Sequence, residues 1–570
     1  MSVGERWLDR AVLGLSAVLA VVLLGPAMGP GYALVGDMVF VPDQDLQPWM
    51  AGLGGSLPRA VPQDVVVALV TGPVPGWVWQ SVALLAALIL LGTGIGRLLR
   101  SAGRRASLVA AVVAVWSPFV GERLLLGHWS LLLAVGALPW ALHHARSARD
   151  GVPGAPARWI LLVALASLTV TGGILVLMVS GPVLLWRGGS GTRVRLMSAV
   201  AGVLLQLPWL VPALLHTGGA SPGGADVFAL RPEGALGALA TALGTGGVWN
   251  AAAVPGSRST WLAPLLTAVL LVLALLGRRA VTSALGRPVA VTLLVASVLG
   301  LAVAVGGAWW VGGLSWVVAH VPGGGLLRDG QKWLAPWLIL LSCAAGCGAT
   351  RVAATAARRG RERALGTVLL VGALVLPLAC LPDLAWGSWG RLSGVRYPAD
   401  WDRVRSVLAS DPRPGDVVSL PWSAYRRFPW NEGRTVLDPA PRYMPRTVVV
   451  SGDLLVAHEG AVVVVPGDDP RATRVGAALT AGGDLTSALR AEGIGFALVE
   501  HVVGDPAPAL PGARIVVRGS DLDLYRLGEP AELPPARGRL AVLVANLLAL
   551  AAVGAAALQL VRTRARRRRG

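Results

Sequence analysis

Three carboxylates stand close together where the first long apolar segment of the chain ends. Asp37, Asp43 and Asp45 lie within nine residues, and the segment before them is apolar back to residue 11 apart from small and turn residues. Acids at the mouth of membrane-spanning helices are uncommon and frequently functional. Such a carboxylate can accept the proton of an attacking hydroxyl, and Asp43 with Asp45 could instead hold a divalent metal. Three solvated loop acids are the alternative interpretation.

A second group of chemically useful side chains follows a later apolar run. Glu122 and Arg123 carry opposite charges, and His128 stands five residues beyond Arg123. Histidine has an intrinsic pKa suited to proton transfer near neutral pH. We expect all three residues to contact substrate at the outer surface. A local ion pair beside an interfacial histidine is the alternative.

Two cations stand four residues apart in Arg328-Asp-Gly-Gln-Lys332, and Lys332 is the only lysine of the chain. On a helix they would share a face. Together they could hold a phosphate or pyrophosphate group, with arginine giving the bidentate contact. Snorkelling of both side chains from a helix end is the alternative.

A polar segment before residue 260 adds Trp249 and Asn250 as candidate substrate contacts. An indole there could stack on a sugar ring, although an interfacial belt explains most membrane-protein tryptophans.

The elements that must position these residues are membrane-spanning helices. The chain has 570 residues, is 54% hydrophobic and 14% charged, and has a mean hydropathy of +0.63. Apolar runs of about 20 residues match the thickness of a bilayer core. We predict a polytopic α-helical protein with about twelve spans, two of them short helices meeting near residues 169–173. The predicted spans are 11–34, 75–95, 106–120, 130–143, two within 159–186, 196–216, 261–276, 288–305, 334–349, 365–384 and 540–561.

The character of the sequence changes after residue 386. Charge rises, alternating strand patterns appear, and no apolar run is long enough to span. We therefore predict a multi-span domain over residues 1–386 and an extracytoplasmic α/β domain over 387–537, a usual domain size. Residues 538–570 form a final spanning helix with a basic cytoplasmic tail.

The net charge of +19 is explained by membrane orientation. The basic breaks between apolar runs hold 26 Lys and Arg against 4 Asp and Glu. An excess of Lys and Arg marks cytoplasmic loops. We expect a plasma-membrane protein with both termini in the cytoplasm and no nucleic-acid partner. The basic breaks are residues 1–10, 97–105, 144–158, 187–195, 278–287, 351–363 and 562–570.

The arrangement resembles the GT-C superfamily of membrane glycosyltransferases. More narrowly, it is similar to actinobacterial integral membrane proteins of the YfhO and arabinofuranosyltransferase types. The likeness is carried by Gly36-Asp37, Asp43-Gln-Asp45, Gly121-Glu-Arg-Leu-Leu-Leu-Gly-His-Trp129 and Leu327-Arg-Asp-Gly-Gln-Lys-Trp333, together with the late α/β domain.

The resemblance implies transfer of a sugar from a polyprenyl-phosphate donor to a cell-envelope glycan or glycolipid acceptor. In such proteins an acid of the first outward loop acts as base or binds metal, which falls here on Asp37, with Asp43 or Asp45 as second candidate. No acid adjoins Asp37, so a divalent metal cofactor is left open. The alternatives are a transporter or flippase of a lipid-linked sugar, and a non-catalytic scaffold for envelope assembly; membrane lipids are partners in each case.

Overall fold

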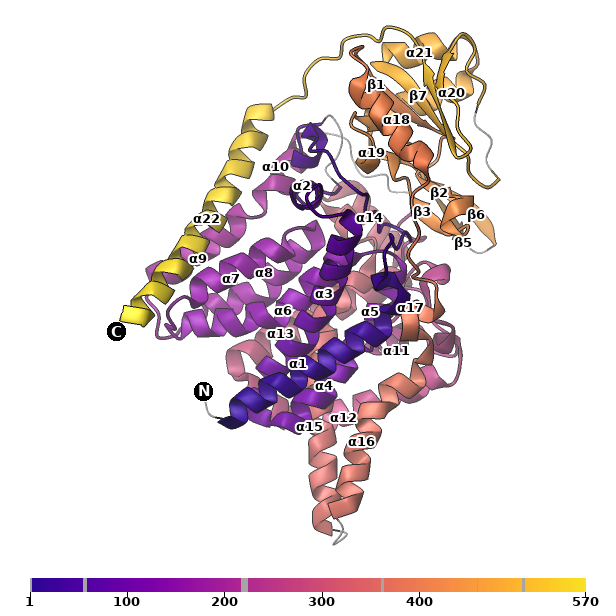
Figure 1. Cartoon of the computed structure of the whole chain (residues 1–570). Coiled ribbons are helices and arrows are strands. Elements are labelled where there is room, and N and C mark those ends of the chain that lie inside the picture. Colours follow the sequence, from indigo (N-terminus) through magenta and orange to yellow (C-terminus); the bar gives the residue numbers. More distant parts are fainter. Residues whose placement is uncertain are drawn as a thin grey trace.

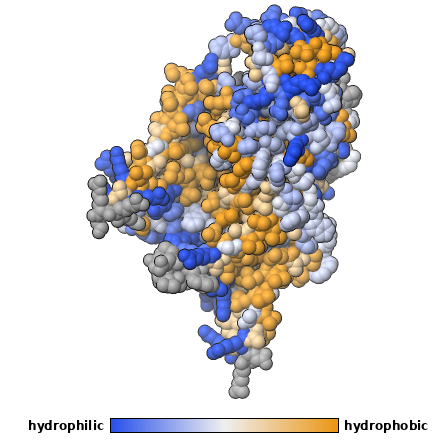
Figure 2. Space-filling view, in the orientation of Figure 1, coloured by the Kyte–Doolittle hydropathy of each residue, from blue (hydrophilic) through white to orange (hydrophobic). Residues whose placement is uncertain are grey.

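Most of the chain forms a bundle of helices, and an α/β domain lies at one end of it (Figure 1). The computed structural model describes residues 3–54, 59–216, 224–359, 363–458, 460–504 and 508–569. In Figure 1 the two termini lie on the side of the bundle away from the α/β domain. Hydrophobic residues cover much of the visible side of the bundle, and hydrophilic residues gather on the α/β domain and at the opposite tips (Figure 2).

Eight helical segments in the described ranges are long and apolar enough to cross a membrane, or nine if one bent pair counts as a span. The chain is therefore a multi-pass membrane protein. The bent pair, α9 (Thr192–Leu204) and α10 (Leu207–Leu215), turns by 51°. The eight segments contain α1 (Val3–Leu24), α3 (Gly76–Leu98), α4 (Arg104–Val115) with α5 (Pro118–Leu125), α12 (Leu262–Leu285), α13 (Arg287–Trp309), α15 (Ala335–Arg359), α16 (Arg363–Cys380) and α22 (Arg539–Arg569).

The prediction of about twelve spans is not confirmed by this count. It also needs α6 (Trp129–Arg149), α7 (Ala155–Ala166) and α8 (Val170–Leu185) to cross. The expected pair of short helices is present, since α7 and α8 are joined by residues 167–169. The helix α14 (Val311–His320) lies between the predicted spans 288–305 and 334–349, where no helix was expected.

The α/β domain is built on a five-stranded sheet with the order β4-β1-β7-β9-β8. β4, β1 and β7 run parallel, whereas β9 and β8 are antiparallel to their neighbours. Residues 470–491 form two helices rather than one, because Gly482 and Gly483 between them both have positive φ angles. The sheet and its helices are β1 (Asp416–Leu420), β4 (Val448–Val449), β7 (Ile494–Glu500), β8 (Arg514–Val517), β9 (Leu522–Arg526), α18 (Ala399–Ser410), α19 (Ala440–Tyr443), α20 (Pro470–Ala481) and α21 (Leu485–Ala491).

Two hairpins extend from this domain, β2 (Tyr425–Arg427) with β3 (Thr435–Leu437), and β5 (Leu454–His458) with β6 (Ala461–Val465). The first of them is fixed to the loop that follows α1. Gly36 N donates to Thr435 O at 2.9 Å, and Leu437 N donates to Gly36 O at 2.8 Å. A second backbone bridge joins Tyr32 and Val395.

Aromatic side chains fill the junction between the first loop and the α/β domain. Tyr397 lies within 5.5 Å, ring centre to ring centre, of Tyr32, Trp401 and Tyr443. Aromatic pairs at such distances add to the free energy gained from burial alone. One continuous hydrophobic core therefore runs from the helical bundle into the α/β domain.

Candidate active site

The first outward loop and the turn between α5 and α6 approach each other through two glycines. Gly36 has φ +52°, and a Cβ there would lie 2.2 Å from Leu126 O. Gly127 has φ +80°, and its Cβ would lie 2.3 Å from the backbone N of Met38. Only glycine combines this backbone conformation with such close approach. The contact lets Asp37 N donate to Leu126 O at 2.9 Å and places Asp37 next to the turn.

Side chains that are far apart in the sequence form a continuous polar chain at this contact. His128 Nε2 lies 3.2 Å from Asp37 Oδ2, and His128 Nδ1 lies 3.0 Å from Arg123 Nη1. Arg123 makes a bidentate pair with Asp329, with distances of 2.5 and 2.7 Å. The structure thus brings together Asp37, Arg123 and His128 of the predicted site and adds Asp329.

Asp37 also receives a hydrogen bond from the α/β domain, because the hydroxyl of Tyr425 on β2 donates to its Oδ1. Burial raises the pKa of Asp37, but hydrogen bonds from His128 and Tyr425 and the charge of Arg442 outweigh it. The pKa of Asp37 therefore lies below its ordinary value. Its side chain is 44% exposed, so the ionised carboxylate is also accessible from the cavity.

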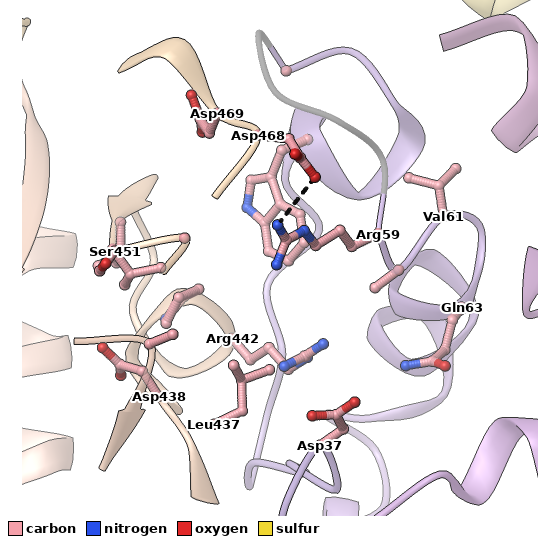
Figure 3. A pocket seen from close by; sticks show the side chains of 18 of the residues that line it. Asp37, Arg59, Val61, Gln63, Leu437, Asp438, Arg442, Ser451, Asp468 and Asp469 are labelled. Carbon is pink, nitrogen blue, oxygen red and sulfur yellow. Dashed lines mark ion pairs between the residues drawn. The ribbon is translucent and has the colours of Figure 1, made fainter. Parts of the chain in front are cut away.

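A cavity of about 790 Å³ opens in front of this carboxylate, between the helical bundle and the α/β domain (Figure 3). It is lined by Asp37, His128 and Lys332 of the predicted site, and by Trp49 and Tyr425. Its walls also include Arg59, Gln63, Asp438, Arg442, Ser451, Asp468 and Asp469.

Cations surround the inner part of the cavity. Lys332 makes no hydrogen bond or ion pair with any residue that the structure describes. Arg442 is held at its Nε by Asp64 at 3.0 Å, and Figure 3 draws its guanidinium beside Asp37. Arg59 pairs with Asp468 across the outer part at 3.6 Å. Asp37, Lys332 and Arg442 therefore line the same cavity.

Asp43 and Asp45 lie outside the cavity lining. Arg405 of α18 contacts both, with 3.3 Å to Asp43 Oδ2 and 2.8 Å to Asp45 Oδ2. A guanidinium thus occupies the space between the two carboxylates, and no group of three His, Cys, Asp or Glu suited to a metal exists among the described residues. These two acids do not fit a divalent ion as arranged here.

Glu122 and Arg123 are neighbours in sequence but face different partners. Glu122 Oε2 accepts from Val248 N at 3.0 Å and from Gln331 Nε2 at 2.7 Å. Its side chain is fully buried and does not line the cavity. Glu122 thereby ties α5 to the segment that carries Lys332.

The expectation that Arg328 and Lys332 share one face of a helix is wrong. Asp329 has ψ +85° and separates the short helix η6 (Gly324–Leu327) from η7 (Gly330–Leu334), which carries Lys332. Arg328 instead lies over the ring of Phe228 at 5.9 Å and does not line the cavity.

Trp249 and Asn250 also lie outside the lining. Trp249 packs edge-on against Phe228, with ring centres 4.8 Å apart. The Asn250 side chain accepts from Ala252 N at 2.9 Å and caps a short helix. Both have local structural partners.

Sequence reasoning missed the residues of this site that come from the α/β domain. Tyr425 follows Asp37 by 388 positions and Arg442 follows it by 405. No local pattern marks either residue. Asp329 was visible between Arg328 and Lys332, but its pairing with Arg123 depends on tertiary structure.

No protein-family model matches the sequence, and no curated protein matches it. Solved structures do resemble the chain. The arabinofuranosyltransferase AftD from Mycobacteria has a TM-score of 0.55 at 17% sequence identity, covering 93% of this chain and 40% of its own. A mutant of the same protein gives 0.55 at 18% identity, covering 93% and 42%. The chain spans about two fifths of the length of that protein. The chain therefore shares the fold of these membrane-protein structures.

Proposed function

We propose that the chain is a glycosyltransferase that moves a sugar from a polyprenyl-phosphate donor to a cell-envelope glycan or lipid acceptor. The observation that carries this proposal is the common cavity of Asp37, Lys332 and Arg442 at the junction of the bundle with the α/β domain. A base and two cations are what displacement of a phosphate leaving group requires.

In the proposed reaction the acceptor hydroxyl oxygen attacks the anomeric carbon of the donor sugar. The bond between that carbon and the phosphate oxygen breaks, and its electron pair stays on the phosphate. Asp37 takes the hydroxyl proton and later releases it to water. This single displacement inverts the anomeric centre and needs no protein nucleophile.

Lys332 and Arg442 would stabilise the charge that develops on the departing lipid phosphate. Charge-assisted hydrogen bonds to phosphate are among the stronger ones in proteins. Arg442 replaces Arg328 in this role, since Arg328 is turned to Phe228. The proposed reaction gives no role to a metal held by Asp43 and Asp45, because both carboxylates form ion pairs with Arg405.

The orientation follows from charge. The basic end of the bundle, with both termini, would face the cytoplasm, and the α/β domain would lie outside the plasma membrane. The cavity then opens toward the extracytoplasmic side, where a lipid-linked donor and an envelope acceptor can meet.

The test is transfer of sugar in proteoliposomes supplied with radiolabelled polyprenyl-phosphate sugars and an envelope glycan fraction. Asp37→Asn should lower the transfer rate by at least about 100-fold, since general-base catalysis contributes roughly that much. Asp45→Asn is the matched control, an acid of the same loop outside the cavity. Full activity of Asp37→Asn, or movement of the carrier across the bilayer without sugar transfer, would overturn the proposal.

A further inference from the structure

The hairpin of β2 and β3 brings the α/β domain directly to the proposed base. Tyr425 on β2 pairs with Leu437 on β3. Two residues of β3, Thr435 and Leu437, form backbone hydrogen bonds with Gly36, the residue immediately before Asp37. The tyrosine and the carboxylate are therefore held by one set of backbone contacts.

The residue next to Tyr425 anchors the same hairpin to the sheet. Arg426 is fully buried, and its Nε donates to Glu500 at 2.7 Å. Its Nη2 donates to Ser419 at 3.0 Å and to Asp438 at 3.1 Å. Since Ser419 and Glu500 belong to β1 and β7, the position of Tyr425 is set by the central strands of the α/β domain.

Each oxygen of the Asp37 carboxylate has its own hydrogen-bond donor. Tyr425 donates to Oδ1, and His128 lies 3.2 Å from Oδ2. Donors on both oxygens fix the plane of a carboxylate and favour its charged form. Burial and the charge of Asp37 raise the pKa of Tyr425 well above its ordinary value, so the hydroxyl keeps its proton.

We propose that Tyr425 is a positioning residue, through which the α/β domain holds the Asp37 carboxylate ionised and oriented toward the cavity. This inference rests on the proposed function, since a positioned base matters only if Asp37 accepts a proton. A tyrosine that merely supported the junction would leave the ionisation of Asp37 unchanged. The ionisation state is therefore the quantity to measure.

The experiment compares Tyr425→Phe with Tyr397→Phe. Tyr397 is the matched control, because its hydroxyl donates to Phe40 O at 3.0 Å and joins the same two parts without touching Asp37. The purified full chain in lipid nanodiscs is treated with a water-soluble carbodiimide and glycine ethyl ester between pH 5 and 8. Activation by the carbodiimide consumes one proton, so the labelling rate falls as the carboxyl becomes more completely ionised. Mass spectrometry gives this rate at Asp37.

Asp37 should be labelled about tenfold faster in Tyr425→Phe than in the wild type, because a hydrogen bond to a charged group contributes about that factor or more. Tyr397→Phe should label at the wild-type rate. Equal rates in Tyr425→Phe and the wild type would overturn the proposal. Equal increases in both variants would also overturn it, because they would assign the effect to a weakened junction.

If Tyr425→Phe does not fold, 3-fluorotyrosine incorporated at all five tyrosines keeps the proposal testable. Its more acidic phenol donates a stronger hydrogen bond, so labelling of Asp37 should slow, and an unchanged rate would contradict the inference. Labelling needs no sugar substrate. An active Asp37→Asn therefore rejects the proposed function, whereas an unchanged labelling rate rejects only the role of Tyr425.

Discussion

Arg123 Nη1 donates to His128 Nδ1 across 3.0 Å, and this contact determines which ring nitrogen carries the proton. A guanidinium can only donate, so Nδ1 must be the unprotonated nitrogen. The proton of a neutral imidazole then resides on Nε2, which faces Asp37 Oδ2 at 3.2 Å. Arg123 itself is fixed by its bidentate pair with Asp329. His128 is thereby a donor to the proposed base, and protonation at Nδ1 would break its contact with Arg123.

Replacing His128 by alanine should move the acid limb of the pH–rate profile to higher pH. The hydrogen bond from His128 lowers the pKa of Asp37, so its loss raises that pKa and reduces the fraction of free base at low pH. The profile of kcat/KM between about pH 3 and 7 measures the effect, because the pKa of Asp37 lies below its ordinary value. His320→Ala is the control, since His320 is exposed and stacks on Trp316 of α14. Superimposable profiles for the two variants would refute the role of His128.

Asp329 should make the protein sensitive to acid. Burial raises the pKa of Asp329, but the charge and hydrogen bonds of Arg123 outweigh burial. The pKa of Asp329 is therefore lowered from 3.8 to about 2. A carboxyl whose pKa is lower in the folded than in the unfolded protein stabilises the folded state when the pH is above the unfolded-state pKa. This stabilisation is lost as the pH falls toward the folded-state pKa. We expect about 2 kcal/mol of stability to disappear between pH 4 and pH 2.

Denaturant unfolding in detergent at stepped pH measures this loss. Asp329→Asn should lack that part of the pH dependence and should also be destabilised at pH 7 by about 3 to 5 kcal/mol, because it leaves Arg123 buried without a carboxylate. Asp45→Asn, at an exposed pair, should cost less than about 1 kcal/mol. Equal stability of the two variants at pH 7 would contradict this account.

The hydrophobic pattern was sufficient to predict the membrane class and the late α/β domain. Long apolar runs and basic breaks are properties of the sequence alone, and the short pair α7 and α8 follows from the length of residues 159–186. The helix α14 was missed because its ten residues, which include Gly312 and Gly313, are too few to carry a spanning signal. The number of crossings depends on how short helices sit in the bilayer, which composition does not determine.

The candidate site was only partly predictable, for a different reason. Asp37, His128 and Lys332 were found because charged side chains beside apolar runs are conspicuous. Tyr425 and Arg442 reach the cavity only because β2 and α19 pack against the first loop, a consequence of tertiary structure. Asp43 and Asp45 looked equivalent to Asp37 by spacing, whereas packing of α18 gives them Arg405 as a partner.

Gly36→Ala should strongly destabilise the junction at Asp37. A Cβ would lie 2.2 Å from Leu126 O, on a backbone with φ +52°, so both the steric contact and the conformation oppose the substitution. We expect a loss of more than about 2 kcal/mol, together with loss of sugar transfer. Thermal unfolding in detergent measures the first effect. Gly14→Ala is the control, because its Cβ would meet nothing within 4 Å, and a Gly36→Ala protein as stable as this control would contradict the packing described.

Removing the two cavity cations should weaken binding of a lipid phosphate, whereas removing Arg328 should not. Lys332 and Arg442 line the cavity, and Arg328 lies outside the lining over Phe228. A charge-assisted hydrogen bond contributes about 1.5 to 3 kcal/mol, so Lys332→Ala and Arg442→Ala should each raise the Kd of a short-chain polyprenyl monophosphate by about 10- to 100-fold. Binding can be followed by the change in tryptophan fluorescence in detergent. Arg328→Ala is the matched control, because it also removes one positive charge from the same segment. This variant should bind the polyprenyl phosphate as tightly as the wild type does. If Arg328→Ala weakens binding as much as Lys332→Ala, the phosphate is not held by the cavity cations alone, and the assignment of Lys332 and Arg442 as its binding residues is wrong.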